Sequence, residues 1–186
     1  CARVVSELGD LCDYYSTINE PNVYATHCYL YGVWPPFKRA SLFGKKIGKE
    51  DGTSERTGSA ASWKNIFVYL NVVNNLAKSH NAAYDAIKSV RPEAQVSIVK
   101  HVHFFDHNGH FLNWLRAMLM RYFQTYSFMN KVKHNLDMIG LNYYRHTKFG
   151  DTQNYLLTDM GWKVFPEGIY GALEILRKYK RPIIIA

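Results

Sequence analysis

Apolar residues recur along this chain in two periods, one typical of helices and one typical of strands. Over residues 63–90 they return every three or four positions, which predicts the longest and clearest helix. Its repeating apolar positions are Ile66, Phe67, Leu70, Val73, Ala77, Tyr84, Ile87 and Val90. Similar patterns predict helices over residues 2–9, with Gly9 as the stop, and over residues 111–126 and 167–179.

Short apolar runs predict four strands, over residues 12–18, 95–102, 137–144 and 182–186. Residues 22–62 are polar, contain many Gly and Pro, and are predicted as a long loop. Strands and helices alternate along the chain, which is the order of parallel βα units. Two α/β folds fit this order: an open doubly wound sheet, and an incomplete (β/α)8 TIM barrel, whose complete form needs about 250 residues.

The composition indicates a globular protein and narrows the classes of partner. The 186 residues are 47% hydrophobic and 15% aromatic, which is enough for one domain spanning residues 1–186. The net charge is +8, but the basic residues are dispersed and form no stripe interleaved with aromatics, which argues against nucleic acid as a partner. No apolar run has the length of a membrane span, so we expect no membrane partner.

The cysteines and histidines do not follow the spacing of a metal site. Cys1, Cys12 and Cys28 cannot all pair, which favours a reducing compartment and a cytoplasmic location. Four histidines and an aspartate crowd residues 101–110, but they mix strand and loop positions, whereas zinc ligands usually keep helical or turn spacings. We therefore expect a polar loop there, and neither a metal ion nor a cofactor.

Polar residues stand where three of the predicted strands end. Asn19 and Glu20 follow the first strand, residues 100–103 close the second, and residues 142–144 close the third. In (β/α)8 enzymes the working residues come from the carboxyl ends of the strands. Glu20 fits a general acid, a role that needs a carboxyl group kept partly protonated near neutral pH. A turn or capping role beside Pro21 is the alternative for the Asn-Glu-Pro run.

Four motifs, in order, resemble family 1 of the glycoside hydrolases, the β-glucosidase family. They are Thr-Ile-Asn-Glu-Pro at 17–21, Asp-Met-Ile-Gly-Leu-Asn-Tyr-Tyr at 137–144, Gly-Trp-Lys-Val-Phe-Pro-Glu-Gly at 161–168 and Pro-Ile-Ile-Ile at 182–185. The resemblance covers essentially the whole chain. It implies a (β/α)8 fold of which this chain is approximately strands 4 to 7, and hydrolysis of β-glycosidic bonds with retention of configuration.

The resemblance also implies roles for individual residues. It assigns the acid/base role to Glu20 and contact with the sugar 2-hydroxyl to Asn19. It places Asn142 and Tyr144 in the active site, the tyrosine hydrogen-bonded to the nucleophile. Strand alternation separately predicts that Asn142 and Tyr144 share a face and that Tyr143 points away. The expected partner is a β-glycoside or oligosaccharide.

The sequence also departs from the family pattern. The family nucleophile is a Glu in a Glu-Asn-Gly motif directly after the seventh strand, and this chain ends at Ala186, just before that motif. We therefore expect strands 1 to 3 and 8 to lie outside these residues, and the 186-residue polypeptide alone to be inactive. Open strand edges would favour its self-association. The fifth strand has Lys100-His101 where the family usually has Asn, so no role is carried over to these two residues.

Two alternatives stay open from the sequence. One is another (β/α)8 retaining glycosidase with the same Asn-Glu pair, and the other is a non-catalytic half-barrel that binds sugar. In the loop after Glu20, an aglycone entrance and simple packing on the barrel are equally good interpretations of Tyr29, Tyr31 and Trp34.

Overall fold

The computed structural model describes residues 1–37 and 63–186. These residues form two compact units, one made of residues 1–20 and 77–186 and the other of residues 21–76. The first unit contains both β-sheets and all the predicted strands. Among the described residues, no helix is both long enough and apolar enough to cross a membrane.

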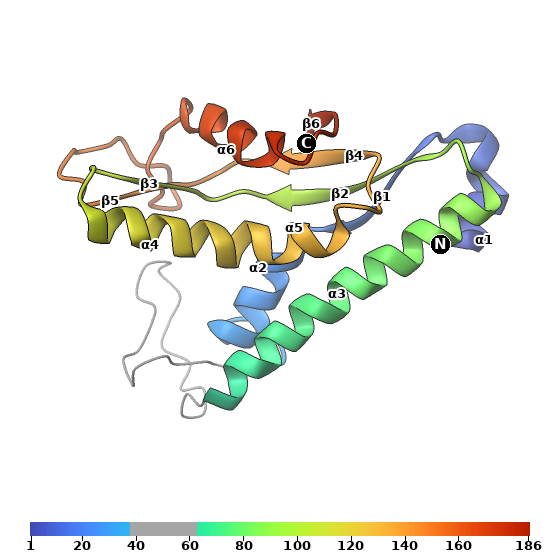
Figure 1. Cartoon of the computed structure of the whole chain (residues 1–186), viewed down its shortest axis with the longest axis horizontal. Coiled ribbons are helices and arrows are strands. Elements are labelled where there is room, and N and C mark those ends of the chain that lie inside the picture. The colour runs from blue at the N-terminus through green and yellow to red at the C-terminus, as the bar shows by residue number, and fades with distance from the viewer. Residues whose placement is uncertain (38–62) are drawn as a thin grey trace. The chain divides into compact units, whose positions relative to one another are not determined.

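The main sheet has four parallel strands in the order β1-β2-β4-β6 (Figure 1). They are β1 (Tyr14–Asn19), β2 (Gln95–His101), β4 (Met138–Asn142) and β6 (Ile183–Ile185). Each predicted strand is present within a few residues of its expected bounds. The spatial order follows the chain order without a reversal. A doubly wound sheet reverses its strand order at a switch point, so these strands have the topology of part of a (β/α)8 barrel.

All four predicted helices are present, and one of them is divided into two. They are α1 (Ala2–Leu8), α3 (Trp63–Val90), α4 (Phe111–Arg121), α5 (Ser127–Val132) and α6 (Gly168–Arg177). Gly9 is the C-cap of α1, as predicted, although it keeps a right-handed helical φ of −58° and begins a 3-10 turn, Gly9–Leu11. The predicted helix over 111–126 runs on through a π-helical turn, Tyr122–Tyr126, into α5.

A second, two-stranded parallel sheet was not predicted. It pairs β3 (Phe104–His107) with β5 (His146–Phe149). These strands follow β2 and β4 after two and three residues, so the two chain segments run on side by side beyond the end of the main sheet. Histidines and charged residues interrupt the apolar pattern there, which hid the strands from the sequence analysis.

The predicted loop over residues 22–62 begins as a helix. The first residues form α2 (Pro21–Ala25) and a π-helical turn, Thr26–Leu30. Proline suits the first position of a helix because the missing N–H has no intrahelical acceptor there. The loop prediction is therefore wrong for these residues, while residues 38–62 lie outside the described part of the chain.

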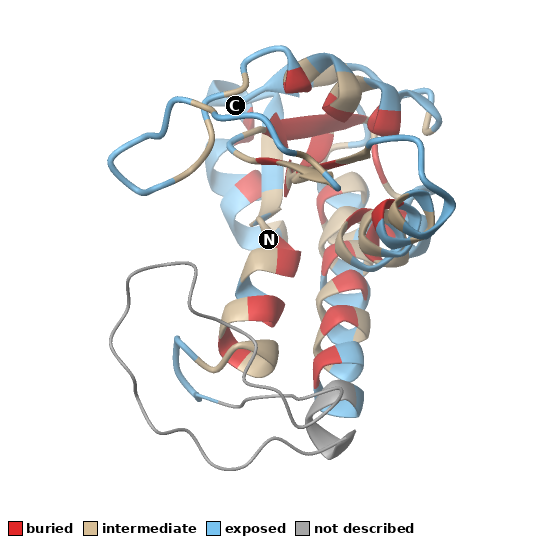
Figure 2. Cartoon of the chain, turned by 90° about the vertical axis from the view of Figure 1, so that its left-hand side faces the viewer, coloured by how far each residue is buried: buried red, intermediate tan, exposed pale blue. Residues whose placement is uncertain are grey.

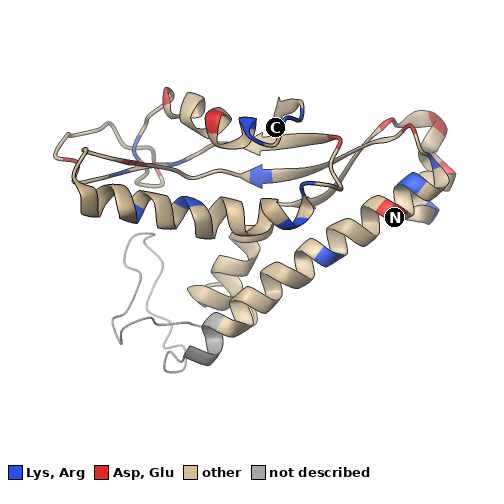
Figure 3. Ribbon diagram, viewed as in Figure 1, with Lys and Arg blue, Asp and Glu red and all other residues tan. Residues whose placement is uncertain are grey.

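Figure 2 shows buried residues along the strands of the main sheet. The core lies on the outer face of this sheet, where the strands contribute fully buried aliphatic side chains. Val96, Ile98, Ile139 and Leu141 are all 0% exposed. The opposite, inner face lines a hollow of about 190 Å³. Its lining residues are Tyr14, Tyr15, Ser16, Ser97, Val99, Met138, Gly140, Ile184 and Ala186. Acidic and basic residues are found mainly on helices and loops (Figure 3).

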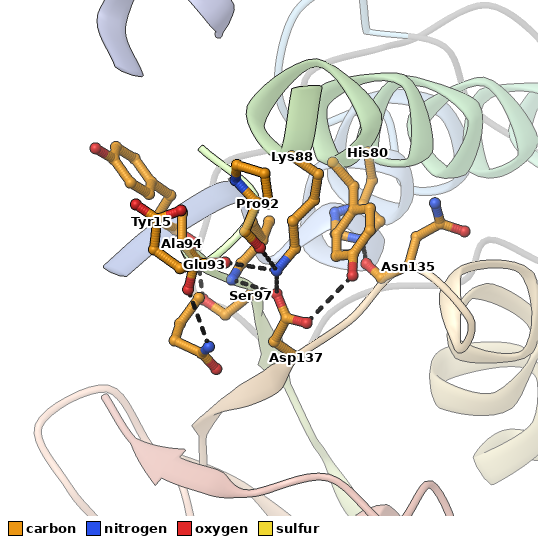
Figure 4. A network of polar contacts seen from close by, with 12 residues as sticks. Tyr15, His80, Lys88, Pro92, Glu93, Ala94, Ser97, Asn135 and Asp137 are labelled. Carbon is orange, nitrogen blue, oxygen red and sulfur yellow. Dashed lines mark hydrogen bonds and ion pairs between the residues drawn. The ribbon is translucent and has the colours of Figure 1, made fainter. Parts of the chain in front are cut away.

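A half-buried polar network joins α3 to the amino ends of β2 and β4 (Figure 4). Asp137 Oδ2 lies 2.8 Å from Lys88 Nζ and accepts a 2.9 Å hydrogen bond from the Val96 N–H, and Tyr84 Oη donates to Asp137 Oδ1 at 3.1 Å. Burial alone would raise the pKa of Asp137, but these hydrogen bonds hold it below its ordinary value. The network stabilises the sheet at the end opposite to the polar strand ends.

Candidate active site

The carboxyl ends of β1, β2 and β4 bring the predicted site residues to one edge of the sheet. Glu20 directly follows β1, and its N–H donates a 2.8 Å hydrogen bond to the Val99 carbonyl of β2. Its φ of +47° lies in the left-handed region, which is unusual for a residue with a side chain. Such strained positions persist where the surrounding structure holds them, and they cluster at functional sites.

The carboxylate of Glu20 is held by Asn142, across the intervening strand β2. Asn142 Nδ2 donates a hydrogen bond to Glu20 Oε1 at 2.7 Å, and Asn142 is only 7% exposed. Asn142 is the last residue of β4 and lies opposite His101 in the parallel ladder. Residues 122 positions apart in the chain are thus joined at one point because their strands end together.

Tyr144 lies on the same side and also interacts with Glu20. Burial raises the pKa of the Tyr144 phenol, and the Glu20 carboxylate raises it further through its charge and a hydrogen bond. The sequence analysis expected this phenol to bond to the nucleophile, which the resemblance puts after Ala186. Within the described residues, the Tyr144 hydroxyl has Glu20 as its hydrogen-bond partner.

Tyr143 points elsewhere, as the alternation predicts. Its hydroxyl donates a 2.7 Å hydrogen bond to the Phe165 carbonyl, in the segment that leads into α6. Burial raises the pKa of Tyr143 to about 12, with a further contribution from the charge of Glu167. Tyr144 therefore lies beside the Glu20 carboxylate, whereas Tyr143 contacts the segment that leads into α6.

Asn19 lies on the inner face of the sheet. It pairs with Val99, whose side chain lines the inner hollow, and it is exposed there. Its side chain is therefore accessible beside Glu20, on the face that a sugar would approach.

Lys100 is the residue near the site whose importance the sequence analysis missed. It is only 1% exposed and is the largest fully buried side chain of the described residues. Its Nζ donates to the His101 carbonyl, and it interacts electrostatically with Glu20. Burial lowers the pKa of Lys100 to about 7, and the Glu20 carboxylate opposes this. A basic segment near the end of β2 is visible in Figure 3, and a lysine directly after the apolar pair Ile98-Val99 was the available signal.

His103, one of the histidines within residues 101–110, contacts neighbouring side chains at this edge of the sheet. His103 accepts from or donates to Thr147 Oγ1 at 2.9 Å and stacks on Phe105 at 4.1 Å. Burial, with the nearby Arg145, lowers the pKa of His103 to about 3, so the ring is neutral at physiological pH. Among the residues that the structure describes, no three His, Cys, Asp or Glu side chains are grouped to hold a metal ion.

The aromatic residues after Glu20 have neighbours within their own unit. Tyr29 makes an edge contact with Tyr24 at 6.1 Å, and His27 lies 5.7 Å from Tyr31 and 4.6 Å from Trp34. These contacts support a packing role for them inside residues 21–76.

The arrangement at the strand ends suits acid/base chemistry on a neutral polar substrate. An exposed amide, Asn19, adjoins a carboxyl group fixed by a second amide and by a phenol. A buried amine lies in electrostatic contact with that carboxyl group. A fixed carboxyl group that can hold or release a proton is what general acid/base catalysis requires.

Comparison with known proteins gives a consistent result. A family model described as Glycosyl hydrolase family 1 matches residues 1–110. The protein "Beta-glucosidase-like SFR2, chloroplastic" of Oryza sativa subsp. japonica is 26% identical over 189 residues, which cover 96% of this chain and 26% of that protein. The 1,4-beta-D-glucan glucohydrolase of Thermotoga neapolitana is 24% identical over 225 residues, covering 97% of this chain and 47% of that protein.

A solved structure is similar over the same extent. The hyperthermophilic β-glucosidase from Pyrococcus furiosus superposes with a TM-score of 0.76 at 25% identity, covering 100% of this chain and 39% of that chain. The chain therefore spans less than half of the length of each of these three proteins.

Proposed function

This chain belongs to glycosyl hydrolase family 1, and from that premise we propose that it supplies the acid/base half of a retaining β-glycosidase active site. The observation that carries the proposal is the Glu20 carboxyl group, held at 2.7 Å by Asn142 at the carboxyl ends of parallel strands. The proposed place of the chain in the complete barrel is approximately strands 4 to 7. The proposed substrate is a β-glycoside, and a β-glucoside is the first to test because the relatives are named for glucose.

In the proposed mechanism Glu20 acts twice. It first gives its proton to the glycosidic oxygen, while a second carboxylate attacks the anomeric carbon and the bond to the aglycone breaks. This produces a covalent glycosyl-enzyme. Glu20, now a carboxylate, then removes a proton from water as the water attacks the same carbon and releases the sugar. Asn142 and Tyr144 would keep the carboxyl group in place through both steps, and Asn19 would bind the sugar 2-hydroxyl.

The second carboxylate is proposed to follow β6. The Ala186 N–H donates to the Leu141 carbonyl at 3.0 Å, so the chain leaves β6 beside Asn142. A glutamate at the next position would stand at the same edge of the sheet as Glu20. Retaining enzymes need two carboxyl groups about 5–5.5 Å apart. Since these residues supply one of the two, the 186-residue polypeptide by itself is proposed to be inactive.

The test is one substitution, Glu20→Ala, assayed with two substrates in the complete enzyme that contains this chain. Glu20→Ala should lower kcat for an alkyl β-glucoside by 10²-fold or more, because the poor leaving group needs protonation. A 2,4-dinitrophenyl β-glucoside needs no such help in the first step, so its loss in that step should be small. Added azide should then accelerate turnover and give a β-glycosyl azide. Full activity of Glu20→Ala on the alkyl glucoside would refute the assignment.

A further inference from the structure

Strand β1 contains one more residue than its partner β2 in the stretch that leads to Glu20. Ser16 pairs with Ser97 and Asn19 pairs with Val99, so three steps along β1 match two steps along β2. The burial of β1 shows the same slip. Exposed and half-buried residues alternate up to Ser16, then Thr17 and Ile18 are both half-buried, and Asn19 is exposed. This is a β-bulge, a feature that re-aims side chains and is common beside active sites.

The bulge decides which face Asn19 occupies. Side chains alternate along a strand, so in a regular register Ile18 would pair with Val99 and Asn19 would point to the helix-covered face. The extra residue puts Asn19 opposite Val99, on the inner face. The left-handed φ of +47° at Glu20 breaks the alternation of side chains along the strand. The Glu20 carboxylate therefore reaches Asn142 on the same inner face as Asn19. Two consecutive residues can thus serve one site.

The bulge is held from the other side of the sheet by His80. Thr17 Oγ1 lies 2.6 Å from His80 Nδ1, and His80 Nε2 lies 2.7 Å from the Asn135 carbonyl (Figure 4 shows His80 and Asn135). His80 is 0% exposed and belongs to the part of α3 in the first unit. The helix, the bulged strand and the segment before β4 are therefore joined through one imidazole ring.

The hydrogen positions follow from the acceptors. A carbonyl only accepts, so Nε2 carries the proton and donates to Asn135. Burial lowers the pKa of His80, which keeps the ring neutral and leaves Nδ1 an acceptor. The Thr17 hydroxyl donates to it, in preference to the Ser97 carbonyl at 3.3 Å. Both ring nitrogens are satisfied in this one tautomer, and Nδ1 needs the Thr17 hydroxyl where the bulge puts it.

We propose that Thr17 and His80 are positioning residues of the active site, which lock the β1 bulge and so keep Asn19 on the substrate face and Glu20 against Asn142. This inference rests on the proposed function for its catalytic consequence. The bulge itself is a property of the fold. Neither Thr17 nor His80 needs to touch substrate, and their effect on hydrolysis passes through Asn19 and Glu20.

The test uses Thr17→Val in the complete enzyme, which keeps the shape of the side chain and removes its hydroxyl. We expect kcat/KM for an aryl β-glucoside to fall by tenfold or more, because small displacements of catalytic groups are costly. Thr17→Ser keeps the hydroxyl and should retain activity within about threefold. Tyr84→Phe is the matched control, since it removes a hydrogen bond between α3 and the far end of the sheet. It should lower stability and leave kcat/KM within about twofold.

A double-mutant cycle separates positioning from a general loss of stability. In an Asn19→Ala background the Thr17→Val substitution should cost less than it does alone, because one of the two residues it positions is already gone. An equal cost in both backgrounds, or an unchanged kcat/KM for Thr17→Val, would overturn the proposal. A Thr17→Ser enzyme as impaired as Thr17→Val would also overturn it.

Two further measurements keep the proposal apart from the proposed function and from failed folding. If the unaltered enzyme hydrolyses no β-glycoside, or if Glu20→Ala is fully active, the proposed function fails whatever Thr17 does. A crystal structure of the unaltered protein tests the bulge by itself. Asn19 opposite Val99 with Thr17 bonded to His80 supports the inference, and a regular register with Ile18 opposite Val99 overturns it even if every Thr17 variant fails to fold.

Discussion

Replacing Lys100 by methionine is expected to stabilise the protein, and the gain should shrink as the pH rises. Lys100 is 1% exposed at the end of β2, and burial lowers its pKa from 10.5 to about 7. The charged form of Lys100 is less stable in this buried position than in water, although the Glu20 carboxylate offsets part of the desolvation cost. Methionine has a similar length and no charge, so it can fill the same space.

The magnitude follows from the change in pKa. Each unit corresponds to about 1.4 kcal/mol, so a fall from 10.5 to about 7 corresponds to about 5 kcal/mol of unfolding free energy. The sign comes from proton binding. Between pH 7 and 10.5 the unfolded chain binds the Lys100 proton more tightly than the folded protein, so this residue makes stability rise with pH. Below pH 7 both states are protonated and the full penalty is present.

The assay is urea unfolding of the unaltered and Lys100→Met proteins from pH 6 to pH 10.5. The difference in unfolding free energy should be about 3 to 5 kcal/mol at pH 6, allowing for imperfect packing of the thioether. It should fall by about 1.4 kcal/mol per pH unit above pH 7 and approach zero near pH 10.5. Titrations shared by both proteins cancel in this difference. The exposed Lys131→Met serves as the control and should show no such slope.

The result that would refute the reasoning is a difference that does not change with pH. A pH-independent gain would mean that methionine merely packs better, and a pH-independent loss would mean that the ammonium is satisfied in the folded protein. Adding Glu20→Gln sharpens the test. Because the Glu20 carboxylate raises the pKa of Lys100, its removal should lower that pKa further and move the onset of the slope below pH 7.

Three further outcomes are expected. Asp137→Asn should lower the unfolding free energy by about 1–3 kcal/mol at pH 7. The contribution of Asp137 is present above its unfolded pKa, about 3.9, and is lost as the pH falls through its lowered folded pKa, so a stability gap that does not narrow as the pH falls below 3.9 would contradict the argument. Asn142→Ala should reduce kcat/KM for a β-glucoside at least tenfold by releasing Glu20, and steady-state kinetics with an unchanged value would exclude this. Gly168→Ala should lower Tm, because a Cβ there collides with the Tyr143 hydroxyl, and an unaltered melting curve would show that the ring moves at no cost.

The regular part of the fold was predictable because packing and local pattern agree there. The long helix over 63–90 has the predicted bounds, and the four strands of the main sheet fall where the apolar runs are. The failures occur where one of these signals is missing. Strands β3 and β5 were missed because they are rich in polar residues where they extend past the main sheet.

The grouping of the candidate site residues was predictable, but their geometry was not. Parallel strands end at one edge, so a pattern of polar strand ends was enough to group Glu20 with Asn142 and Tyr144. The bulge at Thr17 was not visible, since nothing in the run before Glu20 distinguishes an extra residue from a regular one. The contact between Thr17 and His80 joins positions 63 residues apart, and such a pairing depends on tertiary structure.

The two ends of the main sheet differ in how well their local preferences are met. At the amino end, the carboxylate of Asp137 has a charged partner and two further donors. At the carboxyl end, β1 carries an extra residue, Glu20 adopts a left-handed φ and Lys100 buries an amine. Each of these three features costs some free energy of folding. All three lie at or directly after the carboxyl ends of β1 and β2, close to the Glu20 carboxyl group. Substitutions that remove such features stabilise a protein, so the features are expected to disappear from the sequence unless function maintains them. Their concentration around Glu20 is what the proposed acid/base role would produce, and it agrees with the division of (β/α)8 barrels into a stabilising amino face and a working carboxyl face.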